Sequence, residues 1–155
     1  PHKNIFSSQT DEDREAIERA LACTNLLSKR DKEIHALSGG ERQRVWIAMT
    51  LAQKTPMLFL DEPTTYLDIY YQLEILELVK ELNEAQGLTI VMVLHDINQA
   101  IRYSDHIIVM KDGEIVTKGK PNDVVTESMI KTIYGVDVVV KQDEDTGLYM
   151  VPMGI

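Results

Sequence analysis

Two short uncharged stretches constrain the fold more than any other feature of this sequence. Residues 57–60 (MLFL) run directly into Asp61 and Glu62, and residues 89–94 (TIVMVL) run directly into His95. Short apolar runs of this kind are typical of strands that are buried on both faces. Because a helical pattern lies between the two runs, they predict a strand–helix–strand unit with a parallel sheet in an α/β fold.

Helical patterns surround these strands. Thr10 and Asp13 fit a capping pair before the first helix, and Gly87 is a natural stop for the third. The second helix carries apolar residues nearly all the way round, so we expect it to be largely buried. The third helix has an apolar stripe of Ile69, Leu73, Leu76, Val79 and Leu82. The expected helices cover residues 11–27, 40–54, 68–86, 96–103 and 121–133.

Two β-hairpins are expected toward the end of the chain. Residues 106–111 and 114–118 flank Asp112-Gly113, a dipeptide typical of two-residue hairpin turns. Residues 136–141 and 148–151 flank a polar turn. This acidic second hairpin is either a regulatory piece or an ordinary edge hairpin, and we favour the second interpretation.

Composition excludes several classes of protein. The chain has 25 acidic and 16 basic residues, a net charge of −9, which disfavours a nucleic-acid-binding protein because such proteins present a basic face. No apolar run approaches the roughly 20 residues of a membrane-spanning helix. The single cysteine, Cys23, permits no internal disulfide and suits a reducing compartment.

The paired carboxylates Asp61 and Glu62 are the first candidate for chemistry. A carboxylate at the end of a strand can hold Mg²⁺ through its oxygens. A neighbouring carboxylate can orient and deprotonate a water that attacks a phosphoryl group. Acidic residues after a strand can equally cap the next helix or face water, and for an isolated pair that interpretation is the commoner one.

The segment Leu37–Gln43 (LSGGERQ) is the second candidate. Gly39 and Gly40 let the backbone approach a ligand closely, and the helix that follows presents free N–H groups that attract phosphate. Ser38 can donate its hydroxyl. The alternative is purely structural: Ser38 and Glu41 have the spacing of a capping box, and paired glycines are common in loops.

His95 is the third candidate. At the end of a strand it can donate a hydrogen bond to a phosphate, although a lone histidine is more often an ordinary surface residue. The four histidines and Cys23 show no metal-ligand spacing, so we expect no zinc site.

The order and spacing of these features resemble the ATP-binding cassette (ABC) ATPase family. Residues 37–43 are similar to its signature motif, residues 58–62 to its Walker B strand, residues 65–68 (TYLD) to its D-loop, and His95 to its switch histidine. Tyr66 departs from the pattern, since a small residue is common there. The resemblance covers essentially the whole chain and is sharpest over residues 37–119.

Within that family, the sequence more closely resembles one branch, the ATPase subunits of iron–siderophore, haem and cobalamin importers. Residues 91–99 (VMVLHDINQ), 102–106 (RYSDH) and 134–136 (YGV) are similar to that branch.

The sequence contains no phosphate-binding loop of the form G-x-x-x-x-G-K-[ST]. We therefore expect the C-terminal part of a P-loop NTPase (ABC ATPase) fold, an α/β fold with a mostly parallel sheet flanked by helices. Residues 1–155 would form one partial ABC ATPase domain. Within it, residues 1–55 would be a helical subdomain with the signature, 56–119 the catalytic core, and 120–155 a C-terminal helix and hairpin. Such a fragment is expected to be inactive alone.

The resemblance implies a role for each candidate residue. Glu62 would be the catalytic carboxylate, His95 a contact to the γ-phosphate, Asp61 the Mg²⁺ ligand and Asp68 a link between two ATP sites. Nucleotide would be bound in trans by Ser38, Gly39, Gly40 and Glu41.

The resemblance also implies cofactors, partners and a location. The cofactors would be ATP and Mg²⁺. The partners would be a second ATPase subunit, most simply in a homodimer, transmembrane permease subunits and, indirectly, an extracytoplasmic substrate-binding protein. The protein would be peripheral, at the cytoplasmic face of the membrane, and would serve iron–siderophore import.

Two alternatives stay open. The first is an ABC ATPase that does not serve transport, such as one acting in DNA repair or translation. The second is a non-enzymatic regulatory or interaction module with inactive motifs.

Overall fold

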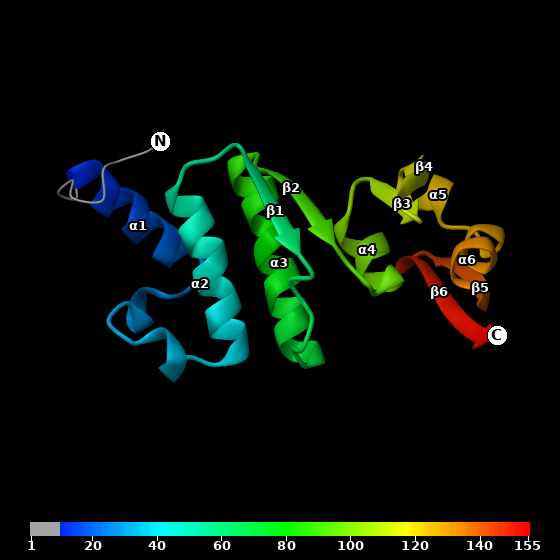
Figure 1. Cartoon of the computed structure of the whole chain (residues 1–155), viewed down its shortest axis with the longest axis horizontal. Helices are drawn as coiled ribbons and strands as arrows, with labels where there is room; N and C mark the ends of the chain where they lie inside the picture. The colour runs from blue at the N-terminus through cyan, green and yellow to red at the C-terminus, as the bar shows by residue number, and fades with distance from the viewer. Residues whose placement is uncertain (1–9) are drawn as a thin grey trace. The chain divides into compact units, whose positions relative to one another are not determined.

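The computed structural model describes residues 10–155, and the first nine residues of the expected helical subdomain lie outside the described part. The chain divides into two compact units, Pro1–Val93 and Leu94–Ile155, which are described separately below (Figure 1).

The first unit is built from three helices and a parallel pair of strands. Its α-helices are α1 (Asp11–Cys23), α2 (Gly39–Ala52) and α3 (Ile69–Gln86), its strands are β1 (Met57–Asp61) and β2 (Thr89–Val93), and short 3₁₀ helices span Leu27–Lys29 and Ile34–Ala36. The strands are in register, with Met57 opposite Thr89 and Asp61 opposite Val93. The predicted strand–helix–strand unit is thus confirmed.

The core of this unit lies between α3, α2 and one face of the β1–β2 sheet. Leu58 and Leu60 point from β1 into this core. The helix α3 is closed at its C-terminal end by Gly87, whose φ of 63° lies in the left-handed region that glycine adopts without strain. The buried residues of the core are Ile47, Leu58, Leu60, Ile75, Leu78, Val79, Leu82 and Leu88.

Two predictions of burial in this unit are wrong. The strands are not buried on both faces, because Phe59 is 70% exposed and β1 alternates between exposed and buried residues. The helix α2 is not buried all round, since Trp46 and Met49 are half exposed. Only one face of a two-stranded sheet and one side of α2 find packing partners among residues 10–93.

The apolar stripe of α3 also differs from the prediction. Ile69 and Leu73 are exposed, while Ile75 and Leu78 are buried together with the correctly predicted Leu76, Val79 and Leu82. The buried residues of α3 therefore begin at Ile75, beyond its first turn.

The first helix is shorter than predicted. It ends at Cys23, four residues before the predicted end at Leu27. Thr24 donates its hydroxyl to the Ala20 carbonyl, and Asn25 has a φ of 56°, so the chain turns away at this point.

The second unit contains a helix and two hairpins joined by short helices. It comprises α4 (Ile97–Tyr103), β3 (Ile107–Lys111), β4 (Glu114–Gly119), α5 (Pro121–Val124), α6 (Glu127–Tyr134), β5 (Asp137–Asp143) and β6 (Gly147–Gly154). Both predicted hairpins are confirmed, the second with longer strands than expected. The single helix predicted over 121–133 is instead two, because Val125 is extended and Thr126 caps α6.

The parallel part of the expected sheet is the β1–β2 pair. The other two sheets of the described chain are the antiparallel hairpins β3–β4 and β5–β6. Among the residues that the structure describes, no helix combines the length and the apolar character needed to cross a membrane.

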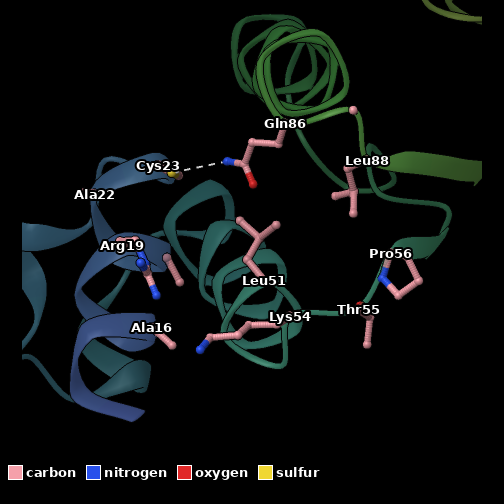
Figure 2. Close-up of a pocket in the computed structure, with 12 residues that line it drawn as sticks. Ala16, Arg19, Ala22, Cys23, Leu51, Lys54, Thr55, Pro56, Gln86 and Leu88 are labelled. Atoms are coloured by element: carbon pink, nitrogen blue, oxygen red, sulfur yellow. Dashed lines mark hydrogen bonds between the residues drawn. The ribbon is translucent and has the colours of Figure 1, made fainter. Parts of the chain in front are cut away.

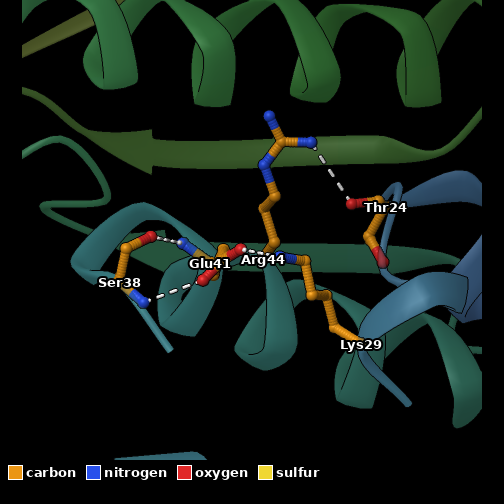
Figure 3. A network of polar contacts seen from close by, with 5 residues as sticks. All are labelled: Thr24, Lys29, Ser38, Glu41 and Arg44. Carbon is orange, nitrogen blue, oxygen red and sulfur yellow. Dashed lines mark hydrogen bonds and ion pairs between the residues drawn. The ribbon is translucent and has the colours of Figure 1, made fainter. Parts of the chain in front are cut away.

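A buried arginine ties the three helices of the first unit together. Arg44, on α2, is 7% exposed and donates to the Thr24 carbonyl at the end of α1, at 3.3 Å (Figure 3). The same guanidinium pairs with Glu74 on α3. A buried charge is tolerated only when it is paired in this way, so Arg44 fixes how α1 and α3 sit on α2.

Replacing Arg44 should therefore destabilise the first unit. Arg44→Ala leaves the Thr24 carbonyl and Glu74 without their donor, and we expect the free energy of unfolding to fall by about 1–3 kcal/mol. Urea denaturation followed by the fluorescence of Trp46, the only tryptophan, measures this.

Lys80→Ala is the matched control. It removes an exposed partner of Glu84 on the same α3, at 4.0 Å, and should change stability by less than about 0.5 kcal/mol. Equal losses in both variants would contradict the role given to Arg44.

Candidate functional site

The first candidate carboxylate stands at the end of the parallel sheet. Asp61 is the last residue of β1, beside Val93 at the end of β2. Its side chain is exposed and makes no hydrogen bond or ion pair with residues 10–155. Ligands of parallel α/β sheets bind at this edge, and an unpaired carboxylate oxygen suits a hard cation such as Mg²⁺.

Glu62 follows in an unusual backbone conformation. Its φ is 48°, in the left-handed region that residues other than glycine seldom adopt. The turn is closed by Thr65, whose N–H donates to the Glu62 carbonyl and whose hydroxyl donates to the Glu62 carboxylate at 3.0 Å. Such conformations persist where the surroundings hold them and are frequent at functional sites. Here the turn holds the exposed Glu62 carboxylate beside the Thr65 hydroxyl.

The loop after Glu62 leads into α3. Tyr66 has a φ of 62° and is fully exposed, although it is a large aromatic residue. Asp68 is the N-cap of α3, and its carboxylate accepts from the Tyr71 N–H at 3.4 Å. Asp68 therefore has a structural role in this chain, and its link to a second ATP site stays a prediction.

The capping-box interpretation of Ser38 and Glu41 is confirmed. The Glu41 N–H donates to the Ser38 hydroxyl at 3.2 Å, and the Ser38 N–H donates to the Glu41 carboxylate at 2.8 Å (Figure 3). Lys29 lies 3.1 Å from the same carboxylate. This network fixes the turn at the start of α2 and leaves Ser38 and Gly39 exposed. It is compatible with phosphate binding at the helix N-terminus.

The same contacts shift two pKa values. The Ser38 N–H lowers the pKa of the Glu41 carboxyl, and Lys29 lowers it further. In turn, the hydrogen bond and the charge of Glu41 raise the pKa of Lys29. Both shifts favour the charged forms, so the pair stays ionised over the whole physiological range.

The two glycines of the segment have unequal surroundings. Gly40 is buried against α3, and a Cβ at this position would lie 3.0 Å from Cδ1 of Tyr71. Gly39 is exposed, and its Cβ would lie 3.4 Å from a methyl group of Leu67. The structure thus brings the Ser38–Glu41 turn against the residues that follow Glu62. Sequence reasoning placed Leu67 in the D-loop segment without its contact to Gly39, and it missed Tyr71, because neither residue carries a group that marks a site.

His95 belongs to the second unit, whereas the other candidate residues belong to the first. It is exposed and lies two residues beyond the end of β2 along the chain, immediately before the N-cap of α4. That N-cap, Asp96, accepts from the Gln99 N–H at 3.0 Å, in line with the predicted capping residue.

A separate cavity of about 540 Å³ lies in the first unit, between α1 and the C-terminal ends of α2 and α3 (Figure 2). Pro56 and Leu88, which line it, precede β1 and β2, so it lies at the opposite end of the sheet from Asp61. Inside it, Gln86 donates to the Cys23 sulfur at 3.4 Å. The cavity is therefore not part of the candidate site.

The charge of Glu41 should make the first unit sensitive to acid. Its folded-state pKa lies below the ordinary value of 4.5, so its contribution to stability is present above that pH and is lost as the pH falls through the folded-state pKa. Glu41→Gln keeps an oxygen that can accept from Ser38 but removes the charge. The stability difference between the two proteins, measured by urea denaturation, should be largest near neutral pH and shrink as the pH falls below 4.5. A difference that is constant across this range would contradict the assignment.

Comparison with known proteins matches this sequence to one family. The model of the family described as ABC transporter matches residues 1–65. The ferric enterobactin transport ATP-binding protein FepC of Escherichia coli is 45% identical over 99% of this chain and 57% of its own length. The petrobactin import ATP-binding protein FpuC of Bacillus anthracis is 51% identical over 94% of this chain and 53% of its own length. The chain thus spans little more than half the length of these relatives.

Solved structures show the same fold. An inward-facing conformation of a metal-chelate type ABC transporter superposes with a TM-score of 0.89 at 26% identity, over 98% of this chain and 62% of that one. The dimeric ATP-binding cassette MJ0796 with ADP and phosphate has a TM-score of 0.61 at 37% identity, over 75% of this chain and 50% of that one. The α/β architecture predicted from the sequence is therefore that of ABC ATPases, which have the P-loop NTPase fold. Over the part of their length that it covers, the chain is similar to ABC transporter ATP-binding proteins, including those of siderophore transport.

Proposed function

We propose that this chain supplies the signature and catalytic part of an ATP-hydrolysing subunit of an importer for iron–siderophore or a related metal chelate. The observation that carries the proposal is the contact between the Ser38–Glu41 turn and Leu67 and Tyr71, which follow Glu62. The proposed phosphate-binding turn and the carboxylate loop thus lie in contact within the same compact unit. The relatives with the printed functions of enterobactin and petrobactin transport support the substrate class.

The turn at the start of α2 would receive phosphate from a second subunit. Ser38, with an exposed side chain, and the N–H groups of Gly39 and Gly40 would contact the γ-phosphate of ATP held by the phosphate loop of the partner. Glu41 would act mainly by ordering this turn, because its carboxylate is already engaged with Ser38 and Lys29. Asp68 would link the two ATP sites of a dimer by placing the loop Thr65–Asp68 between them.

The carboxylates at the end of β1 would carry out the chemistry. Glu62 would orient and polarise the water that attacks the γ-phosphate in line, and His95 would hold the γ-phosphate in the closed state. Asp61 has the exposed, unpaired carboxylate that a magnesium ion requires. When bound, Mg²⁺ supplies charge neutralisation at the phosphates. Most of the acceleration would come from positioning these groups.

The proposed partners follow from the same arrangement. A signature that completes the site of another subunit requires a dimer, and the dimeric cassette among the structural neighbours supports one. Transmembrane permease subunits would hold this dimer at the cytoplasmic face of the membrane, and a substrate-binding protein would act through them.

Glu62→Gln tests the catalytic role in the complete protein encoded by the gene that contains this chain. Gln keeps the size of the side chain but is no general base, so ATP hydrolysis should fall by about 10² or more while ATP binding is retained. Glu84→Gln, which removes an exposed carboxylate on α3, is the control and should leave turnover unchanged. Turnover that survives in the first variant would show that Glu62 is not the base.

The 155-residue chain alone should show no steady ATP turnover, because it has no phosphate-binding loop. ATP turnover by the purified chain would contradict the proposal that it supplies only the signature and catalytic part of the ATPase.

Gly39→Asp tests the contact in trans. Gly39 is exposed, and an Asp here would place a carboxylate against the incoming phosphate and repel it. ATP-driven dimerisation of the complete protein, followed by light scattering, should be lost in this variant and retained in the control Gly39→Ala. Gly40 is less suitable, because any side chain there also collides with Tyr71. Dimerisation of both variants would exclude Gly39 from the interface.

A further inference from the structure

The N-terminal turn of α2 rests on the ring of Tyr71, a residue to which no motif assigns a role. A Cβ at Gly40 would lie 3.0, 3.4 and 3.5 Å from Cδ1, Cγ and Cβ of Tyr71, so helix and ring are in direct contact. Close approach of this kind is possible only because Gly40 has no side chain. The contact joins the turn that carries Ser38 to the first turn of α3.

Tyr71 makes two further contacts, one through its backbone and one through its ring. Its own backbone N–H donates to the Asp68 carboxylate, which fixes the first turn of α3. Its ring meets that of Tyr70 edge to face, with centroids 5.2 Å apart and an interplanar angle of 85°. Aromatic pairs favour this geometry, but Tyr70 is exposed and lies on the same turn, so its ring adds little to the contact between Tyr71 and Gly40.

The contact between Gly40 and Tyr71 is the first in a row of contacts along α2 and α3. One turn farther along both helices, Arg44 pairs with Glu74, and beyond it Ile47 packs in the core with Ile75 and Leu78. Leu67 adds a contact to Gly39 from the loop before α3. The turn and the loop are therefore coupled by a continuous seam of packed groups.

We infer that Tyr71 is a positioning residue, which holds the phosphate-binding turn Ser38–Glu41 and the loop Thr65–Asp68 in one fixed arrangement. The consequence for ATP hydrolysis rests on the proposed function, whereas the positioning itself does not. The ring contributes by shape, because its hydroxyl makes no hydrogen bond with residues 10–155. Phenylalanine should therefore replace it, and alanine should not.

Hydrogen exchange of the 155-residue chain tests the positioning directly. The amides to follow are those of Glu41 and Arg42, which donate to the side chain and the carbonyl of Ser38. In Tyr71→Ala they should exchange about tenfold faster, whereas Tyr71→Phe should lie within about twofold of the wild type. Tyr70→Ala, which removes the neighbouring ring but leaves the Gly40 contact, is the matched control and should also stay within about twofold.

The amides of Leu78 and Val79 in the core separate local from global effects. If they accelerate as much as Glu41 and Arg42 in Tyr71→Ala, the residue acts only on overall stability and the inference is wrong. Unchanged exchange at Glu41 and Arg42 would overturn it as well.

Gly40→Ala gives a second, independent measurement. The added methyl group should speed exchange at Glu41 in the wild type, where it meets the ring, but not in the Tyr71→Ala background, where the space is free. Additive effects of the two substitutions would contradict the contact.

The kinetics of the complete protein test whether this positioning affects ATP hydrolysis. Tyr71→Ala should lower kcat about tenfold while ATP affinity changes less than about twofold, and Tyr71→Phe should restore kcat. An equal loss in Tyr71→Phe would overturn the positioning role. Absence of hydrolysis by the wild type would refute the proposed function, while the exchange measurements would still decide the role of Tyr71.

Discussion

The packing of α2 against α3 is the interaction on which the first unit depends. Gly40 allows the two helices to approach at one end, the Arg44–Glu74 pair connects them in the middle, and Ile47 joins the core with Leu58 and Leu60 of β1. Because Arg44 also bonds the end of α1, one buried guanidinium sets the position of all three helices. A row of close contacts of this kind favours a fixed arrangement of the two helices, which a preorganised site requires.

The same residues of the signature turn serve folding and the proposed chemistry together. Ser38 and Glu41 form a capping box that any helix could use, and Asp68 caps α3 in the same way. Such caps are not an alternative to function here. They hold the exposed groups in one conformation before a ligand arrives, which lowers the entropy lost on binding. The strained Glu62 turn, closed by Thr65, is a further example of local order at a carboxylate.

The sequence predicts most elements of this fold but not their burial. Hydrophobic period and caps located the strands and the longer helices, and Asp112-Gly113 located the first hairpin turn, but the two 3₁₀ helices were not predicted and α5 and α6 were predicted as one helix. Phe59 was misjudged because an uncharged run suggests cover on both faces, while within residues 10–93 only the face with Leu58 and Leu60 packs into the core. The stripe of α3 was misjudged because Ile69 and Leu73 lie at the exposed first turns. The contact between the ring of Tyr71 and Gly40 arises from tertiary packing, for which the sequence offers no local signal. The left-handed φ of Glu62 belongs to a local turn closed by Thr65, which the residue types did not reveal.

A structure of the complete protein with ATP and Mg²⁺, in a variant with Glu62→Gln to prevent hydrolysis, would test the central claim most directly. The account predicts that the γ-phosphate lies within hydrogen-bonding distance of Ser38 and the Gly39–Gly40 backbone of one subunit. It also predicts that residue 62 and His95 of the opposite subunit face the same phosphate. A nucleotide bound away from the Ser38–Gly40 turn, or a turn no longer resting on Tyr71, would contradict it.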